Sequence, residues 1–110
     1  NRLSEINTGN RPITHIKNAP GTYSYIQIKN IVIKGENIVD IDYSVINNYY
    51  VDYESALESI DVTECPKLES INVMRYNSWG ESSLRYLYMT AAQAESVSVT
   101  KLDKVEIVVK

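Results

Sequence analysis

The chain has 110 residues, of which 14 are acidic and 11 are basic, giving a net charge of −3 at pH 7. This length predicts a single domain over residues 1–110, and a start at Asn1 rather than Met is typical of a fragment of a longer chain. The sequence has neither a basic stripe nor a long apolar run, which excludes an electrostatic nucleic-acid binder and a membrane-spanning segment. The single cysteine, Cys65, excludes an internal disulfide.

Most of the predicted elements are strands. Segment 23–35 is rich in Ile, Val and Tyr and ends at Gly35 with a predicted turn. Segment 37–45 alternates apolar and acidic residues, and segment 96–110 contains two further strand-like runs. These patterns predict a mainly β fold.

Two segments leave a helical alternative open. Segments 52–60 and 81–96 contain good helix formers. In the second segment, apolar residues share one face at helical spacing, and Ser83 is a candidate N-cap. Those apolar residues are Leu84, Leu87, Tyr88, Ala91 and Ala92. If both segments are helical, the chain is a small α+β domain, such as an inhibitor or an accessory domain.

A short unit repeats along the chain. Segment 57–62 reads LESIDV, and segment 68–73, eleven residues later, reads LESINV. The unit is an apolar residue followed by two more at offsets of three and five, so its last two members point to one face of a strand. Further copies are Tyr23-Ile26-Ile28, Ile38-Ile41-Tyr43, Leu84-Leu87-Met89, Ala94-Val97-Val99 and Leu102-Val105-Ile107, with partial copies at Leu3-Ile6-Thr8 and Ile13-Ile16.

This unit resembles the leucine-rich repeat, whose core is L-x-x-L-x-L-x-x-N/C. In this chain the matching residues are Leu57, Ile60, Val62 and Cys65. The eleven-residue spacing is similar to that of short-repeat bacterial cell-surface proteins, in which two half-units make one coil of about 22 residues. The resemblance is strongest over 56–73, extends over 83–107 and is weak before residue 50. Spacing stretches to nineteen residues between Ile38 and Leu57 and to sixteen between Leu68 and Leu84.

The resemblance implies a leucine-rich-repeat-like solenoid with short stacked parallel strands and two longer insertions. A coil cannot bury its apolar face alone, so stacked coils present apolar residues at equal offsets. We therefore expect near-complete burial of four paired strand positions and of Cys65 at the turn. The four positions are Ile60, Val62, Ile71 and Val73. Glu58 and Glu69 are expected to be exposed and to stack on adjacent units.

The sequence contains no recognisable catalytic, cofactor or metal motif, so we expect a non-enzymatic protein without a cofactor or metal. The one histidine, His15, has no evident partner for a metal site or a triad. Nucleotide-binding and nucleophile-elbow glycine motifs are absent from the sequence. Acidic residues flank segment 43–54 without the spacing of a calcium loop, and we interpret them as a solvated face. They are Asp40, Asp42, Asp52 and Glu54.

Tyrosines give the strongest indication of function. The chain has nine Tyr, one Trp and no Phe, and exposed Tyr and Trp are enriched in contact surfaces. The candidate binding residues are Tyr49, Tyr50, Tyr76, Trp79, Tyr86 and Tyr88. The first four lie where the repeat spacing is broken, and Tyr86 and Tyr88 alternate with Leu87 and Met89, so in a strand they face away from the core.

The resemblance implies a non-catalytic protein- or glycan-interaction module of an exported or cell-surface bacterial protein. The alternative to this interaction module, besides the small α+β domain, is a purely structural spacer or cap of a larger surface protein.

Overall fold

The computed structural model describes residues 5–17, 29–43, 57–74, 76–77, 80–81 and 84–110. Over these residues the protein has eleven short strands and one short helix, α1. In chain order the elements are β1 (Glu5–Asn7), β2 (His15–Lys17), β3 (Asn30–Lys34), β4 (Asp40–Asp42), β5 (Ser59–Glu64), β6 (Ser70–Val73), β7 (Tyr76–Asn77), β8 (Gly80–Glu81), β9 (Tyr86–Met89), α1 (Ala91–Ser96), β10 (Ser98–Lys101) and β11 (Glu106–Val109). The prediction of a mainly β fold is confirmed.

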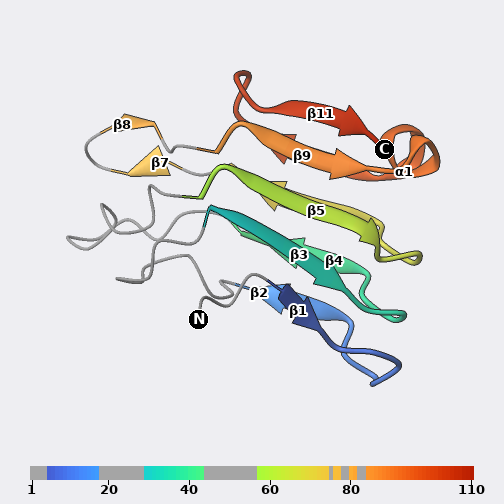
Figure 1. Ribbon diagram of the computed structural model, residues 1–110. Helices are drawn as coiled ribbons and strands as arrows, with labels where there is room; N and C mark the ends of the chain where they lie inside the picture. The colour runs from blue at the N-terminus through green and yellow to red at the C-terminus, as the bar shows by residue number, and fades with distance from the viewer. Residues whose placement is uncertain (1–4, 18–28, 44–56, 75, 78–79, 82–83) are drawn as a thin grey trace.

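The chain alternates between two parallel sheets, which lie one in front of the other in Figure 1. Sheet A has the strand order β1-β3-β5-β9-β11, and sheet B has the order β2-β4-β6-β10. Each of the first four strands of sheet A is thus followed by one strand of sheet B, and β11 returns to sheet A. Strands β7 and β8 form a separate antiparallel pair between β6 and β9.

The interior between the sheets is lined by the last two members of the two clearest repeat units. Ile60 and Val62 of β5 are 0% exposed, and Ile71 and Val73 of β6 are at most 1% exposed. The predicted burial of these four positions is therefore confirmed. The remaining fully buried side chains of the inner strands are Ile31, Ile33, Ile41, Leu87 and Met89, and Tyr43, directly after β4, is fully buried too.

The stacking order of the two clearest units differs from the expectation. Strand β5 lies in sheet A and β6 in sheet B, so the two units do not stack on each other. The Glu58 N–H donates to the Lys29 carbonyl (2.7 Å), whereas the Glu69 N–H donates to the Val39 carbonyl (2.8 Å). Both glutamates are exposed, as predicted, but the prediction that they stack together is wrong. Neighbours within a sheet come from alternate units of the sequence.

Strand β3 follows one of the predicted repeat units in the sequence. The unit Tyr23-Ile26-Ile28 lies outside the described residues. The strand that follows it is β3, whose inward residues are Ile31 and Ile33. In the sequence, Ile28 precedes these two residues at the same apolar offsets, so Ile28-Ile31-Ile33 also fits the repeat pattern.

The helical alternative holds for residues 91–96, which form α1, but not for the two stretches of these segments that form strands. Residues 59–60 belong to β5, and Tyr86–Met89 form β9, in which Leu87 points inward and Tyr88 outward. Pairing of β9 with β5 and β11 outweighs the helix propensity of this segment. The helix that does form, α1, begins after Thr90 rather than after Ser83, which is outside the described residues. None of the described helices is long and apolar enough to cross a membrane.

Helix α1 is fixed at its N-terminus by Gln93. The Thr90 hydroxyl accepts a hydrogen bond from the Gln93 N–H, and the Gln93 side-chain carbonyl accepts one from the Thr90 N–H, which completes a capping box. The Gln93 amide Nε2 also donates to the carbonyls of Val62 (2.8 Å) and Cys65 (3.1 Å). One buried side chain therefore joins α1 to the turn after β5.

Candidate functional site

The outer face of sheet A carries two rows of side chains that run across its strands. Because neighbouring parallel strands pair in register, residues that point outward on one strand lie beside the outward residues of the next strand. The first row is Asn30, Ser59, Tyr86 and Glu106, and the second is Glu5, Val32, Asp61, Tyr88 and Val108. The rows place tyrosines of β9 beside polar residues of β5.

A hollow of about 390 Å³ opens on this face. We call it the Asp61 hollow. Its lining comes from strands β3, β5 and β9 and from the residue that follows β11. The lining residues are Asn30, Ile31, Val32, Ser59, Asp61, Tyr88 and Lys110. Its volume is within the usual range of small-molecule sites and is ample for one large side chain.

Asp61 is the most enclosed charged group of the hollow. Its side chain is 13% exposed, and its Oδ1 accepts hydrogen bonds from the Thr63 N–H (2.9 Å) and the Thr63 hydroxyl (2.7 Å). Its Oδ2 lies 3.0 Å from Lys110 Nζ. Burial by itself raises the pKa of this carboxyl, but the bonds from Thr63 and Lys110 outweigh burial and hold the pKa below its ordinary value. Asp61 is therefore an anion at neutral pH.

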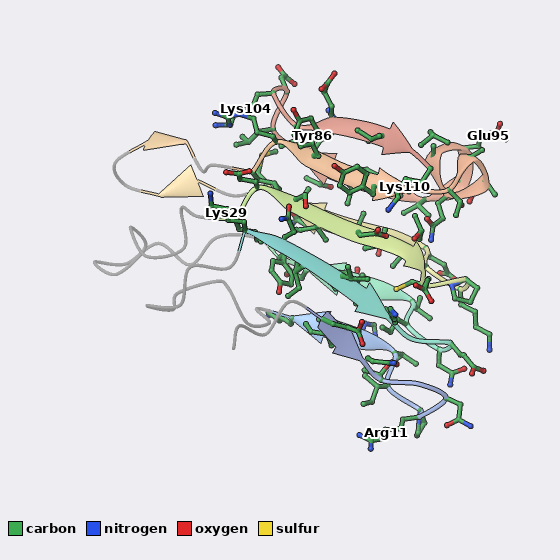
Figure 2. All side chains as sticks on the ribbon, in the orientation of Figure 1. Arg11, Lys29, Tyr86, Glu95, Lys104 and Lys110 are labelled. Atoms are coloured by element: carbon green, nitrogen blue, oxygen red, sulfur yellow. The ribbon has the colours of Figure 1, made fainter. Side chains whose placement is uncertain are left out.

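The aromatic part of the lining of the hollow is the Tyr88 ring. Lys110 Nζ lies 5.1 Å from the ring centroid of Tyr88, a cation–π distance. The rings of Tyr86 and Tyr88 stack with centroids 6.3 Å apart, and Tyr86 is 39% exposed. Figure 2 shows Tyr86 and Lys110 on this same side of sheet A. On the opposite side of the hollow, the Ser59 hydroxyl donates to the Asn30 side-chain oxygen over 2.6 Å.

The structure brings together two of the six predicted binding residues. Tyr86 and Tyr88 stack on each other, and Tyr88 lines the Asp61 hollow. For Tyr76 the structure describes the backbone, in β7, but not the side chain. Tyr49, Tyr50 and Trp79 lie outside the described residues, and the predicted binding role of all six aromatic residues stays a prediction.

Sequence reasoning missed the polar half of the hollow. Asp61 lies between Ile60 and Val62 in the clearest repeat unit, so its outward direction was available from the alternation. The proximity of Lys110 to Asp61 could not be predicted in this way, because these two residues are 49 positions apart in the chain. Only the sheet order makes them neighbours.

His15 lies beside a carboxylate and a serine on the outer face of sheet B. The row His15, Asp40, Ser70 crosses strands β2, β4 and β6. His15 Nδ1 is 3.6 Å from one Asp40 oxygen, and the Ser70 hydroxyl donates to the other over 2.5 Å. The carboxylate thus stands between the imidazole and the serine, whereas activation of a serine nucleophile requires contact with the imidazole.

Cys65 is a core residue, as predicted. It is 0% exposed, and its thiol donates to the Ile33 carbonyl over 3.2 Å. Burial, helped by the charges of Asp61 and Glu64, raises the pKa of this thiol to about 12. A thiol with this pKa is a poor nucleophile and a poor metal ligand at neutral pH.

A smaller hollow, of about 250 Å³, lies at the turns that follow β1, β3 and β5. Its cation is Lys34, with Nζ at 3.2 Å from Glu5 Oε1 and 3.6 Å from Glu64 Oε2. The hydrogen bond and charge of Glu5, with the charge of Glu64, raise the pKa of Lys34. Across the part of the chain that the structure describes, no three acidic, His or Cys side chains are grouped to hold a metal ion.

No family model, curated protein or solved structure matches this chain.

Proposed function

We propose that the protein is a non-catalytic interaction module that binds a protein or a glycan through the outer face of sheet A. In this proposal it is a leucine-rich-repeat-like solenoid of an exported or cell-surface bacterial protein, and the Asp61 hollow is the centre of its contact surface. The alternation of β1 to β6 between two parallel sheets supports the solenoid, because each pair of strands then forms one coil.

The observation that carries the proposal is the Asp61 hollow itself. Its lining combines a nearly buried carboxylate with Tyr88, whose ring stacks on that of Tyr86, a residue that is 39% exposed. Buried charges need partners, and amphipathic aromatic side chains provide contact area at a low entropic cost.

The proposal is tested with Tyr86→Ala on peptide and glycan arrays. Tyr86 is on the surface, so its truncation leaves the core intact, whereas loss of an interface anchor costs about 2 kcal/mol of binding or more. The matched control is His15→Ala, whose side chain is 69% exposed on the outer face of sheet B. We expect ligands of the wild-type protein to bind Tyr86→Ala roughly thirtyfold more weakly and His15→Ala unchanged.

Two results would contradict the proposal. In the first, the wild-type protein binds nothing on either array. In the second, its ligands bind Tyr86→Ala as well as they bind the wild-type protein, which places the contact surface elsewhere.

A purely structural role is the second candidate, and the ends of the stack favour it. The inward residues of the outermost strands are only partly buried, unlike those of the inner strands. They are Ile6, Ile16, Val99 and Ile107, and Leu102, which follows β10, is partly buried as well. A neighbouring coil on either side would complete their burial, which is what a spacer within a larger surface protein requires.

A further inference from the structure

The Asp61 hollow already contains an ammonium group. Lys110 Nζ is 3.0 Å from Asp61 Oδ2 and 5.1 Å from the Tyr88 ring centroid. The first distance is that of a charge-assisted hydrogen bond, and the second lies within the range of a cation–π contact. The Lys110 side chain therefore shows which chemistry the hollow accepts, namely an alkylammonium between a carboxylate and an aromatic ring.

Lys110 is held there loosely. Its side chain is 54% exposed, while that of Asp61 is 13% exposed. Its backbone is fixed by a hydrogen bond from its N–H to the Met89 carbonyl, so the side chain can swing away without disturbing β11. An ion pair with one exposed partner contributes little to stability, and a second amine can replace Lys110 without leaving Asp61 unpaired.

The chemistry of the hollow selects a cation over an anion or a neutral sugar. An ionised carboxylate only accepts hydrogen bonds, and the face of an aromatic ring is its negative side. Both features attract a positive charge, and the chain as a whole carries a net charge of −3. A neutral sugar would have to stack on Tyr86 and would leave the pair of Asp61 and Lys110 in place.

The hydrogen bonds of Asp61 also select between the two basic side chains. Oδ1 is occupied by both donors of Thr63, so Oδ2 remains for the ligand. A guanidinium binds a carboxylate best through both oxygens, whereas an ammonium is a point charge that needs one. This geometry favours lysine over arginine.

We propose that the Asp61 hollow binds a lysine side chain of a partner polypeptide, which takes the place of Lys110 between Asp61 and Tyr88. The inference rests on the proposed function, since it uses the same surface, and it narrows the partner from a protein or a glycan to a protein that presents a lysine. Lys110 is then an internal competitor for the site.

The experiment is a titration of the isotope-labelled protein with blocked lysine (Nα-acetyl-lysine-N-methylamide), followed by amide chemical shifts. The probe should shift the amides of Asp61 and Tyr88 and bind Lys110→Ala more tightly than the wild-type protein. If Lys110 fills the hollow about nine-tenths of the time, its removal strengthens binding about tenfold. Asp61→Asn should abolish binding, because the amide carries no charge.

Blocked norleucine is the matched control ligand, since it has an apolar side chain of similar length without the ammonium. Equal binding of norleucine and lysine to Lys110→Ala would overturn the proposal, and so would the absence of shifts at Asp61 and Tyr88. If Asp61→Asn does not fold, Tyr88→Leu replaces it, and unchanged lysine binding by that variant would count against the site.

A parallel titration with cellotriose distinguishes glycan binding from lysine binding. Shifts at Tyr86 and Tyr88 with cellotriose, together with no response to blocked lysine, would overturn the lysine site and leave the proposed interaction module standing. The interaction module fails by its own test, when Tyr86→Ala binds array ligands as well as the wild-type protein does.

Discussion

Cys65 shows how one buried side chain responds to its surroundings. The rise of its thiol pKa from 9.0 to about 12 lowers the thiolate fraction near neutral pH roughly a thousandfold. We expect native protein to react with a disulfide reagent such as DTNB at pH 8 roughly a thousandfold more slowly than a free cysteine does. Denatured protein should react at the ordinary rate, and fast labelling of folded protein would show that the thiol is accessible.

The raised pKa of the Cys65 thiol also makes the free energy of unfolding depend on pH. A thiol whose folded pKa is raised stabilises the fold fully below its ordinary pKa, and this contribution is lost as the pH rises from 9.0 toward about 12. The direction follows because the unfolded chain ionises first. Urea denaturation of the wild-type protein should therefore show a loss of stability in this window that Cys65→Ala lacks.

Gly35 is required by space rather than by backbone conformation. A Cβ at this position would collide with Thr8 Oγ1 and lie 2.5 Å from Ile38 Cδ1. Overpacking of this kind costs about 1–3 kcal/mol, so Gly35→Ala should lower the free energy of unfolding by that amount. In a Thr8→Ala background the cost should be smaller, because one of the colliding atoms is gone. Additive losses in urea denaturation would contradict this account.

At the scale of elements, α1 depends on Gln93 more than on its own helix propensity. Gln93→Ala removes the side-chain half of the capping box and the two hydrogen bonds to Val62 and Cys65. Leaving buried carbonyls unpaired costs about 1–3 kcal/mol. We expect a destabilisation of that size, and a larger one for Gln93→Glu, which turns a carboxylate oxygen toward those carbonyls.

The control for Gln93 is the exposed neighbour Glu95, which Figure 2 shows on the outside of α1. Glu95→Ala should change the free energy of unfolding by no more than about 0.5 kcal/mol. Thermal denaturation of the three variants measures the difference. If Gln93→Ala and Glu95→Ala were equally stable, the hydrogen bonds from Gln93 would not stabilise the fold.

The sequence predicts strands better than it predicts which strands are neighbours. The offsets of Leu57, Ile60 and Val62 identify an inward face because burial follows the two-residue period of a strand. Nothing in those offsets says whether the next unit joins the same sheet, and the structure places it in the other one. Tyr86 and Tyr88 were predictable as outward residues by the same alternation, but the place of Tyr88 beside Asp61 and Lys110 depends on the sheet order.

At the scale of the whole molecule, burial falls from the middle of each sheet toward its ends. One inward row of sheet B runs through Ile16, Ile41, Ile71 and Val99. The two inner members are at most 1% exposed, whereas the two outer members are partly buried. A strand within a sheet is covered at its sides only by the neighbouring strands, so each end strand has one covered side.

This gradient predicts that the same substitution has different costs along one row. Ile71→Ala should lower the free energy of unfolding by about 2–5 kcal/mol, the cost of a cavity in a closed core. Ile16→Ala should cost less than half as much, because water already reaches the outer strand and no closed cavity forms. Both free energies are measured by urea denaturation, and they are comparable when the unfolding free energy of the two variants depends equally on urea concentration. Equal costs would mean that the N-terminal edge of sheet B is covered in solution, and a loss below about 1 kcal/mol at Ile71 would contradict its place in the core.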